Sequence, residues 1–157
     1  MLIEVPTVNP SDADPAPRHR PVLLHEALSL LAIPAGSLAI DCTVGMGGHT
    51  RALLEAVGPS GRVLGLDRDA ESLAIARENL KDFGDRFLPV HADYRDLVAI
   101  LEERQLGPVA ALLADFGFSS YQMDSAERGF SFTHEGPLDM RLDRSRGTPA
   151  ARLLEAL

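Results

Sequence analysis

The sequence predicts an α/β fold built on an open, doubly wound and mainly parallel sheet of Rossmann type, and three observations support this. Short β-prone runs alternate strictly with helix-periodic segments between residues 22 and 115. The β-prone runs are nearly continuous in apolar residues, as expected of strands covered on both faces. Because crossovers between parallel strands are right-handed, the intervening helices cover both sides of such a sheet.

The amino-terminal elements can be assigned in order. Residues 1–18 contain four prolines and two aspartates, which favours a flexible leader, and residues 19–157 are expected to form one domain. Residues 22–31 have apolar side chains at helical spacing. A short β-prone run, 37–43, then leads through a glycine-rich stretch into a helix from about Thr50 to Val57.

The central part of the chain continues the alternation. Residues 62–67 predict a second strand, and residues 69–83 predict the helix that follows it. Residues 86–93 predict a third strand, in which a proline indicates an edge position. A third helix is expected over 94–104. The run 109–115 predicts the fourth strand, which is the most apolar and is therefore expected to be central.

The character of the sequence changes after Asp115. Residues 116–147 show no sustained periodicity and contain four glycines, which is typical of a long functional loop region. Thr148 and Pro149 then form a favourable helix start. Since an ordinary sheet of this type has further strands, we expect it to be incomplete at its C-terminal end. The apolar fourth strand would then expose an edge that invites self-association.

Composition narrows the classes of function. The 157 residues, 45% of them hydrophobic, suit one domain with a real core. A net charge of −8 argues against nonspecific nucleic-acid binding, so any RNA must meet a local basic surface. The single Cys42 allows no internal disulfide, and the scattered histidines argue against a metal site. With no stretch of transmembrane length and no signal peptide, we expect a cytoplasmic protein without membrane contact.

The stretch "DCTVGMGGHT", residues 41–50, places three glycines between the first strand and the next helix. Each glycine costs backbone entropy, which suggests that a bulky ligand lies against the backbone. This turn sits at the carboxyl ends of the strands, where open α/β sheets bind their ligands. The following helix also offers free N–H groups. A glycine-rich turn used only for packing is the alternative.

Two acids indicate which ligand is bound. A dinucleotide fingerprint requires a third glycine where Thr50 stands. Asp41, at the end of the first strand, would repel a pyrophosphate but would suit a cationic or zwitterionic ligand such as S-adenosylmethionine. Asp67 ends the second strand, where a carboxylate can accept hydrogen bonds from ribose hydroxyls. The pattern therefore favours S-adenosylmethionine over a nicotinamide dinucleotide.

Several longer motifs carry a resemblance. "HRPVLLHEAL", "DCTVGMGGHT", "GLDRD", "ADFGFSSYQMDSAERGFSF" and "GPLDMR" have the order and spacing found in the RsmH (MraW) family. The resemblance runs from about His19 to the last residue. It implies a Rossmann-like class I methyltransferase fold and S-adenosylmethionine-dependent methylation of N4 of a cytidine in small-subunit (16S) ribosomal RNA. Family members continue further, with a helical insertion that helps to hold RNA and with the remaining strands.

The resemblance also implies site residues. It assigns to donor binding Gly47, Gly48, His49, Asp67, Tyr94, Asp115 and Gln122. Asp115 and Phe118 are the catalytic candidates. The segment that they bound resembles the D/N-P-P-aromatic loop of amino methyltransferases, with the acid and the aromatic residue but without the prolines. Asp115 would accept a hydrogen bond from the amine or orient the donor, and the sequence leaves both roles open.

Further candidates concern the RNA. The aromatic residues suited to stacking on a base are Phe118, Tyr121, Phe130 and Phe132, with ordinary packing as the alternative. The basic residues suited to the RNA backbone are Arg128, Arg141, Arg144 and Arg146, with a solvated charged surface as the alternative.

Three functional classes remain: the RNA methyltransferase, a noncatalytic S-adenosylmethionine-binding interaction module from the same family, and, remotely, a nicotinamide-dependent oxidoreductase. The first two share a donor pocket and differ in catalysis. Because the family's RNA-holding insertion is absent, we expect this chain by itself to bind the donor but to transfer methyl groups very slowly or not at all.

Overall fold

A computed structural model of the chain describes residues 21–157, so the leader expected over 1–18 lies outside the described residues. Its centre is a sheet with the strand order β3-β2-β1-β4. The strands are β1 (Leu38–Asp41), β2 (Arg62–Asp67), β3 (Phe87–His91) and β4 (Val109–Leu113). All three neighbouring pairs are parallel, which confirms the predicted sheet and the edge position of β3.

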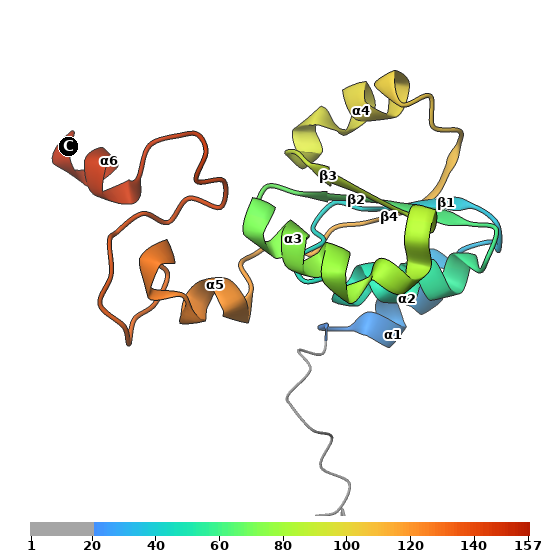
Figure 1. Cartoon of the computed structure of the whole chain (residues 1–157), viewed down its shortest axis with the longest axis horizontal. Coiled ribbons are helices and arrows are strands. Elements are labelled where there is room, and N and C mark those ends of the chain that lie inside the picture. Colours follow the sequence, from blue (N-terminus) through green and yellow to red (C-terminus); the bar gives the residue numbers. More distant parts are fainter. Residues whose placement is uncertain (1–20) are drawn as a thin grey trace, which may run out of the picture.

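Helices cover both faces of this sheet (Figure 1). One face carries α1 (Leu24–Leu31), α2 (Gly48–Val57) and α3 (Ala70–Asn79), and the other carries α4 (Leu97–Glu103). The chain moves outward from β1 to β3 and then returns to the other side of β1 as β4. With right-handed crossovers, this return places α4 on the opposite face. The doubly wound arrangement is thus confirmed.

Each face of the sheet packs its own apolar cluster. Beneath α2 and α3, the cluster includes Leu54 and Leu73. On the side of α4, Ile40, Leu64 and Leu66 pack with Ile100. Strands that are buried from both sides must be apolar at successive positions, which is why their sequences lack polar alternation.

The helix expected over 69–83 is shorter in the structure. Asp69 is its N-cap, since its side chain accepts the N–H groups of Glu71 and Ser72. The α-helix ends at Asn79 and a 3-10 segment, η2 (Lys81–Arg86), follows. Gly84, with φ +55°, interrupts that segment before β3 begins. The third helix similarly opens with a 3-10 turn, η3 (Tyr94–Asp96), before α4.

The expected central position of β4 is wrong. Among the described residues β4 pairs only with β1, so it is an edge strand with an open side. Val109 and Leu112 are exposed, Leu112 to 47%. An apolar strand sequence shows that both faces of the strand are covered by other parts of the molecule. It does not show whether the strand lies at the centre or at the edge of the sheet, because this depends on which strands form hydrogen bonds with it. The open edge expected beside this strand is present.

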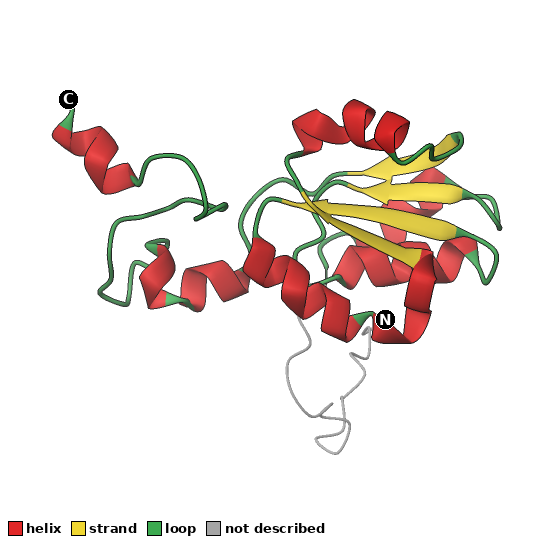
Figure 2. Cartoon of the chain, turned by 45° about the horizontal axis from the view of Figure 1, so that its top comes forward, coloured by secondary structure: helices red, strands yellow, loops and turns green. Residues whose placement is uncertain are grey.

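The described chain has two regions, the sheet body, residues 21–113, and the C-terminal segment, residues 114–157. The segment extends from the carboxyl ends of the strands (Figure 2) and contains α5 (Ser120–Asp124), η4 (Ala126–Arg128) and α6 (Ala150–Glu155). Pro149 is the N-cap of α6, so the predicted helix start is confirmed. None of the helices within residues 21–157 has the length and apolarity needed to cross a membrane.

Candidate functional site

The carboxyl edge of the sheet carries an acid at the end of every strand. Asp41 and Asp67 are the last residues of β1 and β2, while Asp93 and Asp115 lie two residues beyond β3 and β4. Because the strands are parallel, these four side chains emerge at one edge, where open α/β sheets bind ligands. Asp93 is not among the predicted site residues, although it ends the strand expected over 86–93 as Asp67 ends the one over 62–67.

Asp41 stabilises the loop and does not face outward. Its buried carboxylate accepts the Thr50 hydroxyl at 2.7 Å and the Thr43 N–H at 3.0 Å. Burial raises the pKa of Asp41, and these hydrogen bonds oppose the rise. The threonine that replaces the third glycine of a dinucleotide motif is therefore the partner of Asp41. The argument that Asp41 itself meets a cationic ligand is wrong, since its side chain is buried and bonded to Thr43 and Thr50.

The glycines of the loop have different tasks. Gly47 is the N-cap of α2 with φ +93°, and a Cβ there would lie 2.9 Å from a Leu80 methyl carbon. A Cβ on Gly48 would lie 2.5 Å from Pro21 Cγ. By contrast, a Cβ on Gly45 would meet open space. Two of the three glycines thus allow close packing at the start of α2.

Asp67 joins the loops that follow β1 and β2. Its Oδ2 accepts the Gly45 N–H at 2.6 Å, and its Oδ1 accepts the Asp69 N–H at 2.8 Å. Burial raises the pKa of Asp67, while the backbone hydrogen bonds lower it. Each carboxylate oxygen has a second lone pair, so the half-buried Asp67 can still accept hydrogen bonds from hydroxyls.

His49 and Asp115, which are far apart in the sequence, lie next to each other at this edge of the sheet. Nε2 of the buried His49 lies 3.2 Å from the Val22 carbonyl oxygen. Since a carbonyl only accepts, this contact assigns the hydrogen to Nε2. Nδ1 then faces Asp115 Oδ2 at 3.8 Å. The Asp115 side chain is 56% exposed, and its N–H donates to Thr43 Oγ1 at 2.8 Å.

Aromatic rings flank these acids. Tyr94, in the turn after β3, packs against Phe116 with ring centroids 5.3 Å apart. Phe118 stacks on Phe130 at 5.4 Å with an interplanar angle of 23°. Tyr94, Phe116 and Phe118 are all exposed, Phe118 to 57%, and Phe132 is almost fully exposed. The edge therefore presents flat apolar surfaces beside carboxylates, and Phe116 is a member that the sequence analysis did not single out.

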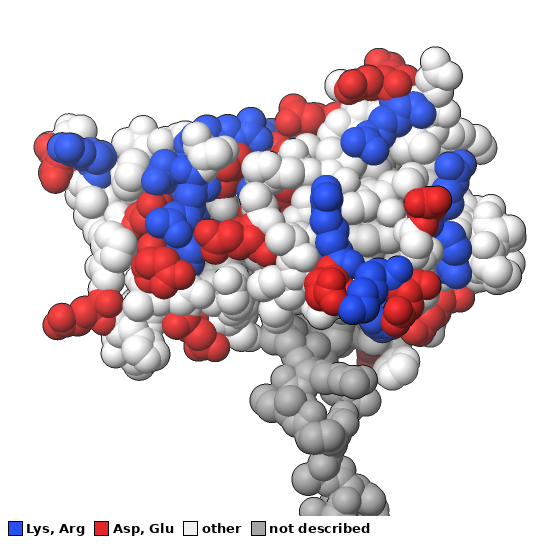
Figure 3. All heavy atoms as spheres, in the orientation of Figure 1, with Lys and Arg blue, Asp and Glu red and all other residues white. Residues whose placement is uncertain are grey.

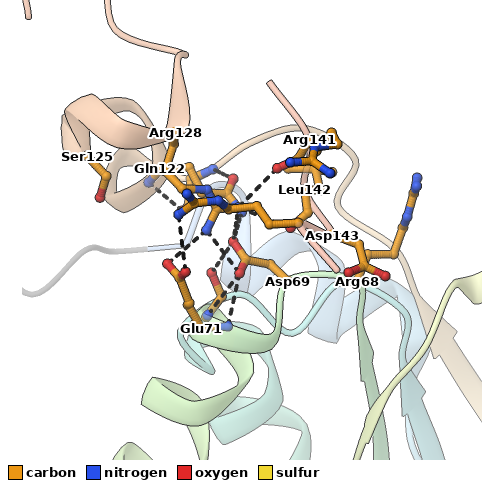
Figure 4. Close-up of polar contacts among 12 residues, drawn as sticks. Arg68, Asp69, Glu71, Gln122, Ser125, Arg128, Arg141, Leu142 and Asp143 are labelled. Atoms are coloured by element: carbon orange, nitrogen blue, oxygen red, sulfur yellow. Dashed lines mark hydrogen bonds and ion pairs between the residues drawn. The ribbon is translucent and has the colours of Figure 1, made fainter. Parts of the chain in front are cut away.

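Gln122 lies in a different cluster from His49 and Asp115. Its Nε2 donates to Asp69 Oδ2 at 2.6 Å, and its Oε1 accepts the Ser119 N–H at 2.9 Å. Arg128 meets the same carboxylate (Figure 4). Burial alone would raise the pKa of Asp69, but the hydrogen bonds from Arg128 and Gln122 outweigh it and hold the pKa below its usual value. The cluster joins the C-terminal segment to the start of α3.

The expected RNA-contacting arginines differ in availability. The Arg128 side chain is 0% exposed, so its expected contact with an RNA backbone is wrong. The Arg141 guanidinium forms two hydrogen bonds with Asp139 and lowers the pKa of that carboxyl to about 2. Arg144 and Arg146 are exposed. Basic and acidic side chains lie interspersed over the C-terminal segment on the face that Figure 3 shows.

Concave surface occurs at both ends of the strands. A depression of about 380 Å³ lies at their amino-terminal ends, beside Leu38, Arg62 and Val109. A smaller one of about 80 Å³ lies at the carboxyl side, next to Arg128 and Asp143. Within residues 21–157, no three or more His, Cys, Asp or Glu side chains are grouped so as to hold a metal ion.

Comparisons with known proteins identify the family of the chain. The model of a family described as the MraW methylase family matches residues 16–157. The ribosomal RNA small subunit methyltransferase H of Trichlorobacter lovleyi is 45% identical over 137 residues, which are 87% of this chain and 44% of that protein. The protein of the same name from a Nocardioides species is 48% identical over 141 residues, 88% and 44% of the two chains. The chain thus spans less than half the length of these relatives.

Solved structures resemble the fold at low sequence identity. The O-methyltransferase from Bacillus cereus, in complex with SAH, superposes with a TM-score of 0.50 at 18% identity, covering 89% of this chain and 69% of that one. A protein-L-isoaspartate O-methyltransferase gives a TM-score of 0.50 at 16% identity, covering 60% and 29%. The Rossmann-like methyltransferase fold expected from the sequence is confirmed.

Proposed function

The chain belongs to the MraW methylase family, and we propose that it binds S-adenosylmethionine for methyl transfer to N4 of a cytidine in 16S ribosomal RNA, in the cytoplasm. The observation that carries this proposal is the convergence at one sheet edge of the glycine loop, Asp67 and the His49–Asp115 pair. These groups follow the ends of three different strands, β1, β2 and β4, so only the folded molecule brings them together.

The residues present fit the donor. Gly47 lets the chain enter α2, and the first turn, which begins at Gly48, supplies N–H groups that lack helical partners, whereas the Gly47 N–H donates to the Val44 carbonyl at 2.8 Å. Asp67 retains acceptor capacity for ribose hydroxyls. Tyr94, with Phe116 against it, supplies a ring for the adenine. When bound, the donor supplies an electrophilic methyl group on a sulfonium.

Gln122 is the donor-binding candidate with the least freedom. Its amide is already bonded to Asp69 and to the Ser119 N–H. One amide hydrogen and one oxygen lone pair remain available. Gln122 can therefore contact the donor through these two groups, and its neighbours fix the orientation of its side chain.

Asp115 and Phe118 carry the proposed acceptor chemistry. The N4 lone pair of cytosine is delocalised into its ring, so the amine needs orientation to become a nucleophile. An exposed Asp115 carboxylate can accept an N4–H hydrogen bond and receive the proton that the nitrogen sheds, and Phe118 offers its open face to the base. His49 Nδ1, 3.8 Å from Asp115 Oδ2, is a second acceptor for that proton.

The chain has few basic side chains that could contact the phosphates of an RNA. The net charge is −8, Arg128 is buried, and Arg141, Arg144 and Arg146 each pair with a carboxylate of the chain, so a phosphate must compete with an acid even for the exposed Arg144 and Arg146. Because each phosphate contact adds only a salt-sensitive share of affinity, we expect weak RNA binding by this chain alone. Methyl transfer should accordingly be slow.

Two measurements test the proposed function. Calorimetry should show S-adenosylmethionine binding by the chain, and its absence would contradict the proposal. Tritiated-methyl incorporation into unmethylated small ribosomal subunits should be far slower than with the Nocardioides relative at equal concentration, with N4-methylcytidine as the product in a nuclease digest. Donor binding with no transfer at all would favour the noncatalytic module, and turnover equal to that of the relative would contradict our account of RNA binding.

A further inference from the structure

The buried side chains of the C-terminal segment are unlike those of the sheet body. Every buried residue described within 114–157 is polar or charged: Gln122, Arg128, Asp139 and Asp143. Such a region gains little from apolar burial and depends on the pairing of its buried polar groups. Arg128 is the largest of these side chains, and its burial is favourable only if its charge is paired.

Arg128 joins three parts of the chain. Its guanidinium contacts Asp69 twice, with Nη1–Oδ1 at 3.2 Å and Nη2–Oδ2 at 2.8 Å. Nη1 also donates to Glu71 Oε2 at 3.0 Å, and Nη2 donates to the Leu142 carbonyl at 3.1 Å (Figure 4). The side chain thus connects the first turn of α3 with η4 and with the chain near residue 142.

A path of hydrogen bonds leads from this ion pair to the loop that contains the proposed catalytic residues. Asp69 Oδ2, which binds Arg128, also accepts Gln122 Nε2 at 2.6 Å. Gln122 Oε1 accepts the Ser119 N–H, and Ser119 Oγ accepts the Gln122 N–H in return. Ser119 directly follows Phe118, so the reciprocal pair fixes the end of the 115–118 loop.

We propose that Arg128 is a positioning residue that fixes the 115–118 loop over the donor site by holding Asp69 and, through it, Gln122. The inference rests on the proposed function, and Arg128 itself contacts neither donor nor base. Without Arg128, the Asp69 carboxylate would stay buried without its cationic partner, which is strongly unfavourable. The segment would then relieve this cost by releasing Asp69 to water, and Gln122 would lose its fixed partner.

The Ser119 amide offers a direct readout, because its acceptor is the Gln122 side chain. In a ¹⁵N-labelled sample, Arg128→Met should accelerate hydrogen exchange of the Ser119 amide at least tenfold, while the Leu64 amide in the sheet body keeps its protection. The matched control is Arg152→Met, which removes an exposed arginine of the same segment whose only ion-pair partner within residues 21–157 is Glu155. This control should leave both amides within twofold of the parent chain.

A second variant, Arg128→Lys, keeps the positive charge beside Asp69 and so still tests the proposal if Arg128→Met fails to fold. An ammonium cannot reproduce the bidentate contact with Asp69, so Ser119 exchange should fall between those of the parent and Arg128→Met. Parent-like exchange in Arg128→Lys would overturn the proposal. Equal acceleration of the Ser119 and Leu64 amides in both variants would also overturn it, since Arg128 would then only stabilise the whole fold.

Calorimetry with S-adenosylmethionine tests whether the position of the 115–118 loop affects donor affinity. Arg128→Met should lower it at least tenfold and Arg152→Met by less than twofold. Faster Ser119 exchange with unchanged affinity would overturn the positioning role. If the parent chain binds no S-adenosylmethionine, the proposed function fails, whereas the exchange measurement still decides whether Arg128 fixes the loop.

Discussion

The sheet body and the C-terminal segment are held together by different forces. In the body, two clusters of buried apolar side chains occupy the faces of a parallel sheet. In the segment, the buried residues are polar or charged and are joined by ion pairs and hydrogen bonds. Apolar burial is tolerant of small displacements, whereas paired charges lose most of their benefit when one partner moves. The body is therefore a scaffold, and the segment is a loop region fixed by specific contacts.

The largest expected effect tests whether stability resides in the body. Leu64→Ala removes a fully buried side chain of β2 from the apolar cluster on the side of α4 and should lower the free energy of unfolding by about 3 kcal/mol. The same change at Leu154, which is 60% exposed on α6, should cost less than about 0.5 kcal/mol. Urea unfolding followed by circular dichroism measures both, and similar losses would remove the contrast between the regions.

Of the two acids proposed for the donor site, Asp67 in the sheet body should contribute more to donor affinity than Asp115 in the C-terminal segment. Asp67→Ala removes an acceptor that also holds the Gly45 N–H and should weaken S-adenosylmethionine binding by about 1–3 kcal/mol. Asp115→Ala removes a more exposed carboxylate, for which we expect less than about 1 kcal/mol. Calorimetry on both variants, with Asp67→Asn as the isosteric control, ranks them. Unchanged affinity in Asp67→Ala would exclude Asp67 from the donor site.

Acid should loosen the segment before the body. The pKa values of Asp139 and Asp143 are held at about 2 by Arg141 and by Ser145 with Arg146. A carboxyl with a lowered pKa stabilises the fold fully above its unfolded value, about 3.9, and loses this contribution as the pH falls towards 2.

In the body, burial raises the pKa of Asp41 and Asp67, and only Asp93 among its strand-end acids has a lowered pKa. Protonating Asp41 or Asp67 therefore does not remove a favoured charge. In amide spectra recorded from pH 5 to pH 2, signals of residues 114–157 should broaden first. Simultaneous loss of the signals of both regions would show that they unfold as one unit.

The smallest effect on stability is expected at the open edge of β4. Leu112→Lys places a charge on an exposed edge position and should change the free energy of unfolding by less than about 0.5 kcal/mol. It should nevertheless abolish self-association, because a lysine on an edge opposes strand pairing between molecules. Sedimentation over a range of concentrations tests this. A parent chain that stays monomeric throughout would show that the edge does not attract a second copy.

Sequence reasoning located most of the fold because hydrophobic periodicity is a local signal. The four strands, the helices between them and the edge position of β3 were predicted within a few residues. Errors occurred where local pattern carries no information. An apolar run such as Val109–Leu113 reads the same in the middle of a sheet and at its edge, and only pairing distinguishes the two.

The candidate site divides in the same way. The sequence alone determined the glycine loop, Asp67 at the end of its strand and the family motifs, since these are set by short spacings along the chain. Only the tertiary structure decided that Asp41 faces inward, that His49 meets Asp115, and that Arg128 is buried against Asp69, 59 residues away. The physical reason is that the sequence around an arginine in a polar loop predicts an exposed side chain. Its burial depends on a carboxylate that the fold, and not the neighbouring residues, brings to it.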